Sequence, residues 1–467
     1  MLSQALRRLA RLHNWEAHAR GQMAAEVDSS PCKELCRLLG RPQAAYRVVH
    51  VAGSKGKGTV AALVACALEA AGWRVGVMSS PHVSHVTERL TICGSPVSEE
   101  LLAQSLHAAV DARDEAARCG SVGGRASWFD TFVAASFHAM ALSRVEWAVV
   151  ECGLGGRLDS TNVVSSDVAL LTSVELEHTE VLGSTHAAIA REKASIVTLG
   201  GALIAAVEGE AAAEVARVAR ERGARSLTIL PPSPEPLGQK GNLALVRLAL
   251  NELGRRGVRV VRHEGSAARP EANLSVARDA LLSDQLLSET VILRAASRLP
   301  ARQESLNASC GTPVLVDGAH TPTSVSALVA AIRGSDPPPA ALPVSPVVLI
   351  GMMANKDAPQ LMRSLAPLKA HHVICSPLLD SDSTSKVDHV SPFELASFAN
   401  DAGVSSSTCE NPASGLETAL ELARQTNAWV LVVGSFRICS QVRHMLNPVH
   451  PTRGKLFNTV ISKRPFS

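Results

Sequence analysis

A glycine-rich loop with two lysines offers the clearest chemistry in the chain. The apolar run Val48–Ala52 has the length of a strand, and the sequence GSKGKGT that follows it leads directly into a helical pattern. Glycines let backbone amides approach phosphate oxygens, and a helix N-terminus favours negative charge. The loop therefore predicts ATP binding through Gly53, Ser54, Lys55, Gly56, Lys57, Gly58 and Thr59, with Lys57 on the terminal phosphates and the Thr59 hydroxyl on Mg²⁺.

The spacing of this loop departs from the usual phosphate-binding pattern. The loop is shorter than GxxxxGK[ST], and Gly58 stands between the lysine and the hydroxyl residue. A glycine-rich turn that carries a solvated pair of lysines is the alternative interpretation. The loop alone is thus a moderate signal.

Two further polar residues stand where strand-like runs end. Glu151 closes one such run, and His178 follows another. Open α/β sheets build their sites at the carboxyl ends of strands, and carboxylates suit Mg²⁺. Both residues are candidate metal ligands, although an isolated histidine is as a rule structural.

Strand-like and helix-like runs alternate through the first part of the chain. The strand-like runs are Val48–Ala52, Val75–Ser79, Trp147–Cys152, Val168–Ser173 and Ala202–Val207. Such alternation is typical of an α/β fold with a mainly parallel sheet. A second series begins near Pro313, so we predict a large domain over residues 1–298 and a smaller α/β domain over residues 299–467.

The composition excludes several classes of protein. The chain has 467 residues, of which 46% are hydrophobic and 19% charged, a balance that predicts a globular protein of two or three domains. The net charge of +3 and the scarcity of aromatic residues argue against nucleic acid as a partner. The 10 cysteines are scattered without a CxxC pair, which favours a reducing compartment. We expect no membrane partner, because the apolar runs have only strand length.

The opening segment MLSQALRRLARL allows two interpretations. It is rich in arginine and poor in acidic residues, as a mitochondrial presequence would be, but its leucines also fit an amphipathic first helix. We favour the helix and a cytoplasmic location, with a mitochondrial location as the alternative.

Five segments in order carry a specific resemblance. They are HVAGSKGKGT, SSPHVSHVTERL, ECGLGGRLDSTNVV, the REKASIV region and VDGAHTPTSVSAL. Together they resemble the folylpolyglutamate and dihydrofolate synthase family of the Mur ligase superfamily. The resemblance runs over residues 35–207 and, more loosely, over residues 299–446. It implies a large N-terminal domain like that of P-loop NTPases and a smaller Rossmann-like C-terminal domain.

The resemblance also implies roles for residues across the chain. Two magnesium ions would be held by Thr59, Ser80, Glu151 and His178, and Lys193 would be carbamylated, although a surface lysine is the alternative. Lys57, Glu151, His178, Lys193 and His320 would be catalytic. Asn242, Arg302 and Asp317 would contact the nucleotide. For Asn242, the alternative is an exposed asparagine at the start of a helix. Phe129 and Asp159 would line a pteridine pocket, with core packing as the alternative for the aromatic ring.

The implied reaction is ATP-dependent ligation of L-glutamate to dihydropteroate through an acyl phosphate, which forms dihydrofolate. The GSKGKGT loop, Glu177 before His178, and Thr321 in DGAHT favour this substrate. Extension of the glutamate tail of a reduced folate, or both activities together, is the alternative. A non-catalytic relative that binds ATP and folate and a cell-wall Mur ligase are further alternatives. We expect a monomer.

Overall fold

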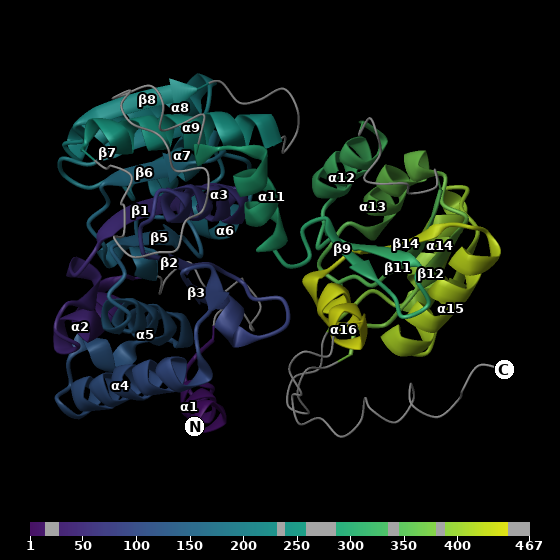
Figure 1. The fold of residues 1–467 in the computed structure, drawn as a ribbon, viewed down its shortest axis with the longest axis horizontal. Coiled ribbons are helices and arrows are strands. Elements are labelled where there is room, and N and C mark those ends of the chain that lie inside the picture. Colours follow the sequence, from purple (N-terminus) through teal and green to yellow (C-terminus); the bar gives the residue numbers. More distant parts are fainter. Residues whose placement is uncertain (15–27, 231–238, 258–285, 335–344, 380–387, 447–467) are drawn as a thin grey trace, which may run out of the picture. The chain divides into compact units, whose positions relative to one another are not determined.

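The computed structural model describes residues 1–14, 28–230, 239–257, 286–334, 345–379 and 388–446 (Figure 1). These residues form two compact units, Met1–Pro300 and Ala301–Ser467. The division predicted from the sequence, at residues 298 and 299, lies close to this boundary. Each unit is described by itself.

The first unit is built on a sheet of eight strands in the order β4-β3-β2-β5-β1-β6-β7-β8. Its parallel strands are β1 (Arg47–Ala52), β2 (Val75–Met78), β5 (Trp147–Glu151), β6 (Val168–Leu171), β7 (Ala202–Ala206) and β8 (Ser226–Leu230). The short strands β3 (Leu90–Ile92) and β4 (Ser95–Pro96) add an antiparallel edge. The mainly parallel α/β fold predicted from the sequence is confirmed, and β1 lies at its centre.

Helices cover both faces of this sheet because side chains alternate along its buried strands. Val49 and Val51 of β1 face a core shared with α3 (Lys57–Ala70), α9 (Gln239–Arg255) and α11 (Glu289–Ser297). Val48 faces the opposite core. The helices on that side are α1 (Leu2–Leu9), α2 (Ser30–Leu38), α4 (Glu99–Arg118) and α5 (Trp128–Leu142), with α7 (His186–Ala194) and α8 (Gly209–Glu221) over β6 and β7.

The amphipathic helix predicted at the start of the chain is α1. Its residues Leu2, Ala5 and Leu9 are buried in the core that contains α4 and α5. Short helical turns connect the larger elements: η2 (Pro42–Ala44), η3 (Val86–Arg89), η4 (Val122–Arg125), η5 (Ser160–Val163) and the four-residue α6 (Thr179–Leu182). Within the described ranges, no helix combines the length and the apolar character that crossing a bilayer requires.

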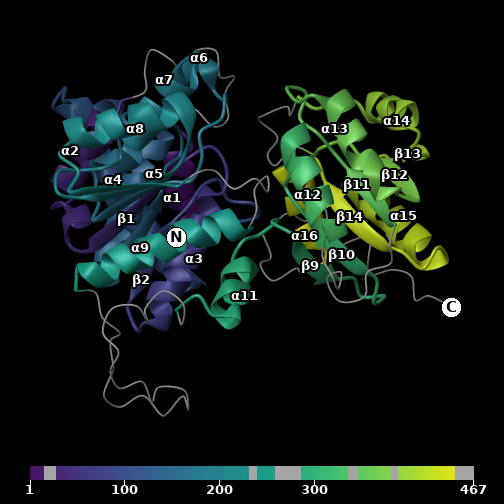
Figure 2. The same cartoon turned by 90° about the horizontal axis from the view of Figure 1, so that it is seen from above.

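The second unit has a smaller sheet in the order β13-β12-β11-β14-β10-β9. The parallel strands are β10 (Pro313–Val316), β11 (Pro346–Ile350), β12 (His372–Cys375), β13 (Ser406–Thr408) and β14 (Trp429–Val433), and β9 (Glu304–Asn307) is antiparallel to β10. The helices α12 (Pro322–Gly334), α13 (Ala358–Leu365) and α14 (Pro392–Asp401) share one core with this sheet, and η7 (Ala366–Leu368) follows α13. The helices α15 (Pro412–Gln425) and α16 (Phe436–Leu446) pack against β14 (Figure 2).

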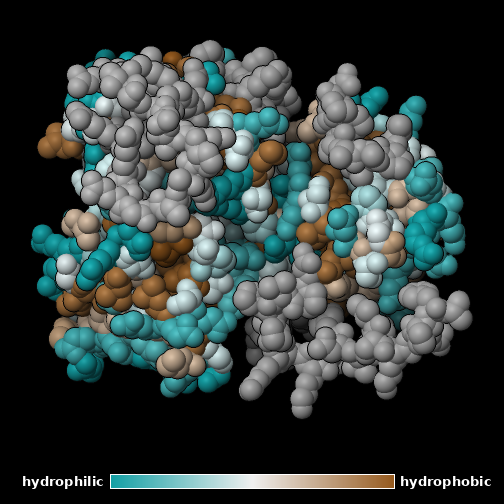
Figure 3. All heavy atoms as spheres, in the orientation of Figure 1, coloured by the Kyte–Doolittle hydropathy of each residue, from teal (hydrophilic) through white to brown (hydrophobic). Residues whose placement is uncertain are grey.

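The surface of each unit mixes hydrophilic and hydrophobic residues (Figure 3). Apolar atoms supply about 55–60% of the surface of ordinary folded proteins. The apolar patches visible in Figure 3 therefore identify no partner by themselves.

Candidate nucleotide and substrate site

The phosphate loop, residues 53–59, joins β1 to α3, and its backbone requires glycine at two positions. Gly53 has a φ of 145°, and a Cβ atom there would lie 1.9 Å from Oγ1 of Thr172. Gly56 directly precedes α3 with a φ of 81°, and a Cβ atom there would lie 2.8 Å from Oδ1 of Asn242. Any other residue would clash at these two positions and would be strained by the positive φ angle. The loop therefore follows a backbone path that depends on glycine. The same geometry places Asn242 of α9 directly against the loop.

The segment after β6 holds this loop in place. The amide of Ser54 donates to the carbonyl of Ser173 at 3.0 Å, and the amide of Lys55 donates to Oγ of Ser173 at 3.0 Å. The amide of Glu175 in turn donates to Oγ of Ser54 at 3.0 Å. The loop is therefore a built structure and not a solvated turn.

Two lysines meet at one oxygen of the loop. Nζ of Lys57 donates to the carbonyl of Gly53 at 2.9 Å, and Nζ of Lys193 donates to the same carbonyl at 3.0 Å. Lys193 is only 2% exposed and pairs with Oε1 of Glu177 at 3.1 Å, so the alternative of a surface lysine is wrong. Burial and the charge of Lys57 lower the pKa of Lys193, while Glu177 opposes this shift.

Glu151 reaches the loop from the end of β5. Its Oε2 atom lies 3.6 Å from the position that a Cβ atom on Gly58 would occupy, and the amide of Ser80 donates to the same oxygen at 3.4 Å. The carboxylate therefore lies between the start of α3 and the loop that follows β2. His178 begins α6 in the left-handed conformation, with a φ of 51°, directly after Glu177.

The donors present fit magnesium bound together with phosphate. Mg²⁺ usually takes one or two carboxylates and completes its shell with water and substrate phosphate oxygens. The part of the chain that the structure describes has no group of three or more histidine, cysteine or acidic residues that could hold a metal alone. One carboxylate, that of Glu151, lies beside the phosphate loop, which is the protein contribution expected of such a shared site.

Replacing Glu151 by glutamine tests this carboxylate. The change keeps the size of the side chain but removes the charge that would face Mg²⁺. We expect the ligation rate to fall by about 10²-fold, the usual loss for one electrostatic contact at a reacting centre. Half-maximal rate should also require more Mg²⁺, which initial rates over a magnesium series will measure. Glu175→Gln is the control, because Glu175 is a neighbouring acidic residue that anchors the loop through its main-chain amide; this variant should keep the magnesium requirement of the wild type. An unchanged requirement in Glu151→Gln would exclude Glu151 as a ligand.

Phe129 and Asp159 meet at Gly153, two residues after Glu151. A Cβ atom on Gly153 would lie 2.7 Å from Cζ of Phe129 and 3.2 Å from Oδ2 of Asp159. An aromatic ring and a carboxylate thus both lie against a backbone position that has no side chain. Phe129 is partly buried and packs against the core under α5, as the alternative interpretation expects. The motif ECGLGG contains Gly153, but its spacing alone does not indicate this contact.

A buried chain of hydrogen bonds orients the Asp159 carboxylate. Oδ2 accepts from the amide of Leu154 at 2.8 Å, and Oδ1 accepts from the amide of Thr161 at 2.9 Å and from its hydroxyl. The Thr161 oxygen also lies 2.9 Å from Nε2 of His50. His50, Asp159 and Thr161 are buried, and burial raises the pKa of Asp159 while its donors oppose the shift. The carboxylate is therefore held in one orientation beside Phe129.

Replacing Thr161 by valine should weaken this orientation. The change keeps the volume and removes one hydroxyl donor from a charged acceptor, a contact worth about 1.5–3 kcal/mol. We expect KM for the pteroate substrate that the resemblance implies to rise about tenfold with little change in kcat, because uniform binding is lost. Substrate titrations at saturating ATP and glutamate will measure this. Thr131→Val removes an equally buried hydroxyl that, among the described residues, donates to the carbonyl of Ser127 at the N-cap of its helix. Equal effects of the two variants would contradict the role of Thr161.

In the second unit, Asp317 follows β10 and orders the turn around it. Oδ2 accepts from the amide of Gln303 at 2.9 Å, and Oδ1 accepts from the amide of Ala319 at 2.8 Å. Burial raises the pKa of Asp317, and these backbone donors oppose the shift. Asp317 thus ties β10 to the segment before β9.

Phe436 supports two more of the residues singled out in the sequence. The Arg302 guanidinium lies 4.7 Å above the centre of its ring, and the His320 ring lies 5.9 Å from it. A Cβ atom on Gly318 would lie 2.3 Å from the same ring, so only glycine fits there. Nδ1 of His320 donates to the carbonyl of Gly318 at 2.8 Å, because a carbonyl can only accept. Arg302, Asp317 and His320 therefore belong to one cluster; their approach to ATP stays a prediction.

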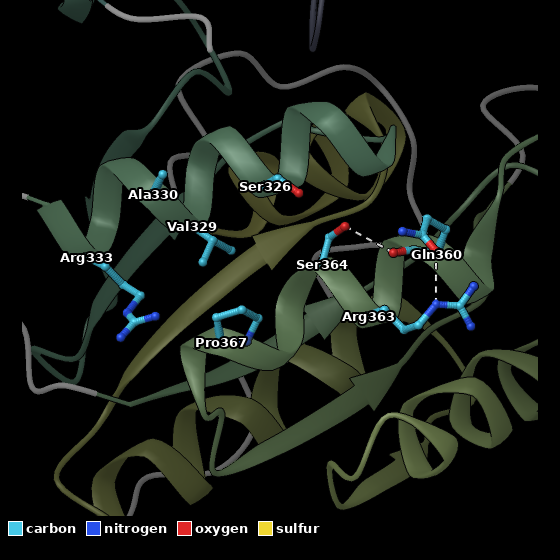
Figure 4. A pocket seen from close by; sticks show the side chains of 8 residues that line it. All are labelled: Ser326, Val329, Ala330, Arg333, Gln360, Arg363, Ser364 and Pro367. Atoms are coloured by element: carbon cyan, nitrogen blue, oxygen red, sulfur yellow. Dashed lines mark hydrogen bonds between the residues drawn. The ribbon is translucent and has the colours of Figure 1, made fainter. Parts of the chain in front are cut away.

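A surface hollow of about 720 Å³ lies elsewhere in the second unit (Figure 4). It opens between α12 and α13 and is lined by Ser326, Val329, Ala330, Arg333, Gln360, Arg363, Ser364 and Pro367. The residues singled out in the sequence are not among these. We do not assign it to the proposed reaction.

Comparison with known proteins identifies the family. The family model of the Mur ligase glutamate ligase domain matches residues 301–436. The folylpolyglutamate synthase of Lacticaseibacillus casei is 30% identical over 350 residues, which cover 73% of this chain and 79% of that enzyme. Other curated relatives, from Bacillus subtilis and Mycobacterium tuberculosis among them, match over 48% and 35% of their own length.

Two solved structures extend the comparison over nearly the whole chain. E. coli FolC in complex with DHPP and ADP has 25% identity and a TM-score of 0.70, and the match covers 96% of this chain and 98% of that one. The bifunctional folylpolyglutamate synthase/dihydrofolate synthase of Yersinia pestis, complexed with AMPPNP and a Mn ion, has 25% identity and a TM-score of 0.66, covering 95% and 98%. The chain therefore belongs to the folylpolyglutamate synthase/dihydrofolate synthase family of Mur ligases, which are acid–amino-acid ligases.

Proposed function

We propose that this chain is an ATP-dependent ligase that joins L-glutamate to dihydropteroate and forms dihydrofolate. The observation that carries the proposal is the end of β5. Glu151 lies near the phosphate loop at Gly58, and two residues later Gly153 lies against both Phe129 and Asp159. The nucleotide with its metal and a flat ring with amino groups would thus bind at neighbouring positions along one short stretch of backbone.

The chemistry begins with an unreactive carboxylate. Transfer of the γ-phosphoryl group of ATP to the pteroate carboxylate gives an acyl phosphate, and the glutamate amine then displaces phosphate to form the amide. Phosphoryl transfer needs mainly positioning and charge neutralisation, and alignment of the reactants contributes about 7–11 kcal/mol. In our proposal the loop amides and Lys57 hold the phosphates, while Asp159 and Phe129 hold the ring.

Magnesium would be held by Thr59, Ser80, Glu151 and His178. When bound, the ion neutralises the phosphate charge as transfer proceeds. Ser80 and Glu151 already share a hydrogen bond, which supports a common site. A second ion would require a further negative group, and a carbamate on Lys193 would supply it.

The remaining nucleotide contacts are proposed from both units. Asn242 already lies against Gly56, so its amide stands near the loop and can donate to or accept from a base edge. Arg302, Asp317 and His320 would act from the second unit on the nucleotide and the phosphoryl group in transfer. Arg302 and His320 both lie at the ring of Phe436, and Asp317 bonds the amides of Gln303 and Ala319 next to them, which supports a shared role.

The choice of dihydropteroate rests on the residues that resemble dihydrofolate synthases, namely the GSKGKGT loop, Glu177 and Thr321. The structural relative that binds DHPP is compatible with it, whereas the L. casei relative is named for tail extension. A phosphate-release assay with glutamate and either dihydropteroate or tetrahydrofolate, followed by mass spectrometry of the product, decides between them. Ligation of tetrahydrofolate alone would overturn the substrate, and no ligation of either would overturn the activity.

A further inference from the structure

The last helix of the first unit lies along the helix that begins at the phosphate loop (Figures 1 and 2). Leu287, Val291 and Ala295 recur every four residues, and all three are buried in the core that contains α3. Leu299 continues the same spacing and packs partly buried against that core. Val291 and Ala295 share one face of α11, while Leu287 precedes this helix and Leu299 follows it. The segment that leads into the second unit is therefore fixed along α3.

A nearly buried carboxylate adds a specific contact to this packing. Glu69, near the end of α3, has a side chain that is 6% exposed. It accepts from Nη1 and Nη2 of Arg298 at 3.0 and 2.6 Å, one bond to each of its oxygens, and from Nη2 of Arg294 at 3.2 Å. A Cβ atom on Gly94 would lie 2.0 Å from Arg298, so the guanidinium lies directly over that glycine. We call Glu69, Arg294 and Arg298 the Glu69 clamp.

The chain returns to the phosphate loop immediately after the clamp. Cδ2 of Leu299 lies 3.9 Å from the position that a Cβ atom on Gly58 would occupy, the position that Glu151 also approaches. Ala301 and Gln303 then take left-handed φ angles of 51° and 48° on either side of Arg302. Non-glycine residues rarely adopt this conformation, and it concentrates at functional sites. The clamp is thus followed, within four residues, by the loop contact and by Arg302.

We propose that Glu69 is a positioning residue for the ligation. By holding Arg298 and Arg294 it fixes Leu299 at the phosphate loop, and with it the start of the segment that carries Arg302. The proposal rests on the proposed ligase function. The phosphate loop can bind the ATP phosphates without this segment being fixed, whereas the transfer step needs Arg302 in place. Loss of the clamp should therefore lower kcat much more than it lowers nucleotide affinity.

Glu69→Gln tests the clamp, because it keeps the size of the side chain and removes its charge. We expect kcat to fall by about 10- to 100-fold, the scale of a misplacement of about 1 Å at a reacting centre. KM for ATP should stay within about twofold of wild type. Amide hydrogen exchange over residues 287–299 should become faster. Glu214→Gln is the matched control: Glu214 is 12% exposed and binds Arg191 and Arg217 at 2.6 and 2.7 Å within the same unit, but on α8.

Several outcomes overturn the proposal. A wild-type kcat in a folded Glu69→Gln protein would do so whatever the exchange rates, and so would a loss of ATP affinity as large as the loss of kcat. Unchanged exchange over residues 287–299 would overturn the clamp alone. If Glu69→Gln does not fold, Arg298→Lys keeps the charge, loses the two-pronged contact and should show the same changes in weaker form. No ligation by the wild-type protein would instead overturn the proposed function and the catalytic half of this proposal with it.

Discussion

Replacement of Lys57 by alanine is expected to abolish ATP turnover while the fold persists. Lys57 starts α3 and points back over the phosphate loop, where its Nζ atom lies 2.9 Å from the carbonyl of Gly53. Removing a cation that faces a transferring phosphoryl group should cost about 10³-fold in kcat or more. The fold loses one hydrogen bond to a neutral acceptor, worth about 1 kcal/mol net. Activity and stability should therefore respond very differently.

Phosphate release, circular dichroism and ADP binding measured on the same preparation will show this separation. Lys55→Ala is the matched control, since the contacts that Lys55 makes with Ser173 and Thr172 come from its own main-chain amide and carbonyl. It should lose much less activity than Lys57→Ala. A Lys57→Ala protein with wild-type turnover and a normal spectrum would refute the assignment of the loop.

The parts of the site that were predictable from the sequence are those with local chemistry. A strand, a glycine turn and a helix in immediate succession indicate a phosphate loop, because the required backbone path and helix end are both encoded within a few residues. Glu151 was predictable for a related reason: it ends a buried strand, where open α/β sheets build their sites. Lys193 was not, since a lysine in a helix is expected at the surface, and only the resemblance of REKASIV indicated otherwise.

Contacts between distant segments account for what the sequence did not indicate. Glu69 lies in α3 and Arg298 directly follows α11, and neither segment carries a pattern that indicates its charged partner. The edge strands β9 and β13 have the sequences ESLN and SST, which lack the apolar runs that identify buried strands. They pair because a neighbouring strand offers free backbone groups at the edge of the sheet. Thr161 and Gly153 likewise acquire their roles only when the turn after β5 folds back on Asp159.

The second large effect is expected at Lys193. Because Lys57 and Lys193 both bond the carbonyl of Gly53, their Nζ atoms cannot be more than about 6 Å apart, a repulsion of about 3 kcal/mol at an effective dielectric of about 20. Glu177 compensates for one of these charges. A carbamate would instead turn the pair of like charges into a pair of opposite charges. It forms when the neutral amine adds to CO₂ and releases a proton, and the lowered pKa of Lys193 favours the neutral amine.

Lys193→Ala should therefore reduce ligation by about 10³-fold, comparable to the loss of other charged groups that stabilise phosphoryl transfer. The truncation leaves room beside Gly53 that a small molecule can enter. If the working form is a carbamate, acetate or propionate should restore part of the rate, because either places a carboxylate where the carbamate would be. Ethylamine should not. Lys57→Ala is the control, since its missing group is a cation and no carboxylic acid should restore it. Restoration of Lys193→Ala by ethylamine, with no response to acetate, would show instead that Lys193 acts as a cation paired with Glu177, and it would remove the negative ligand proposed for a second magnesium site.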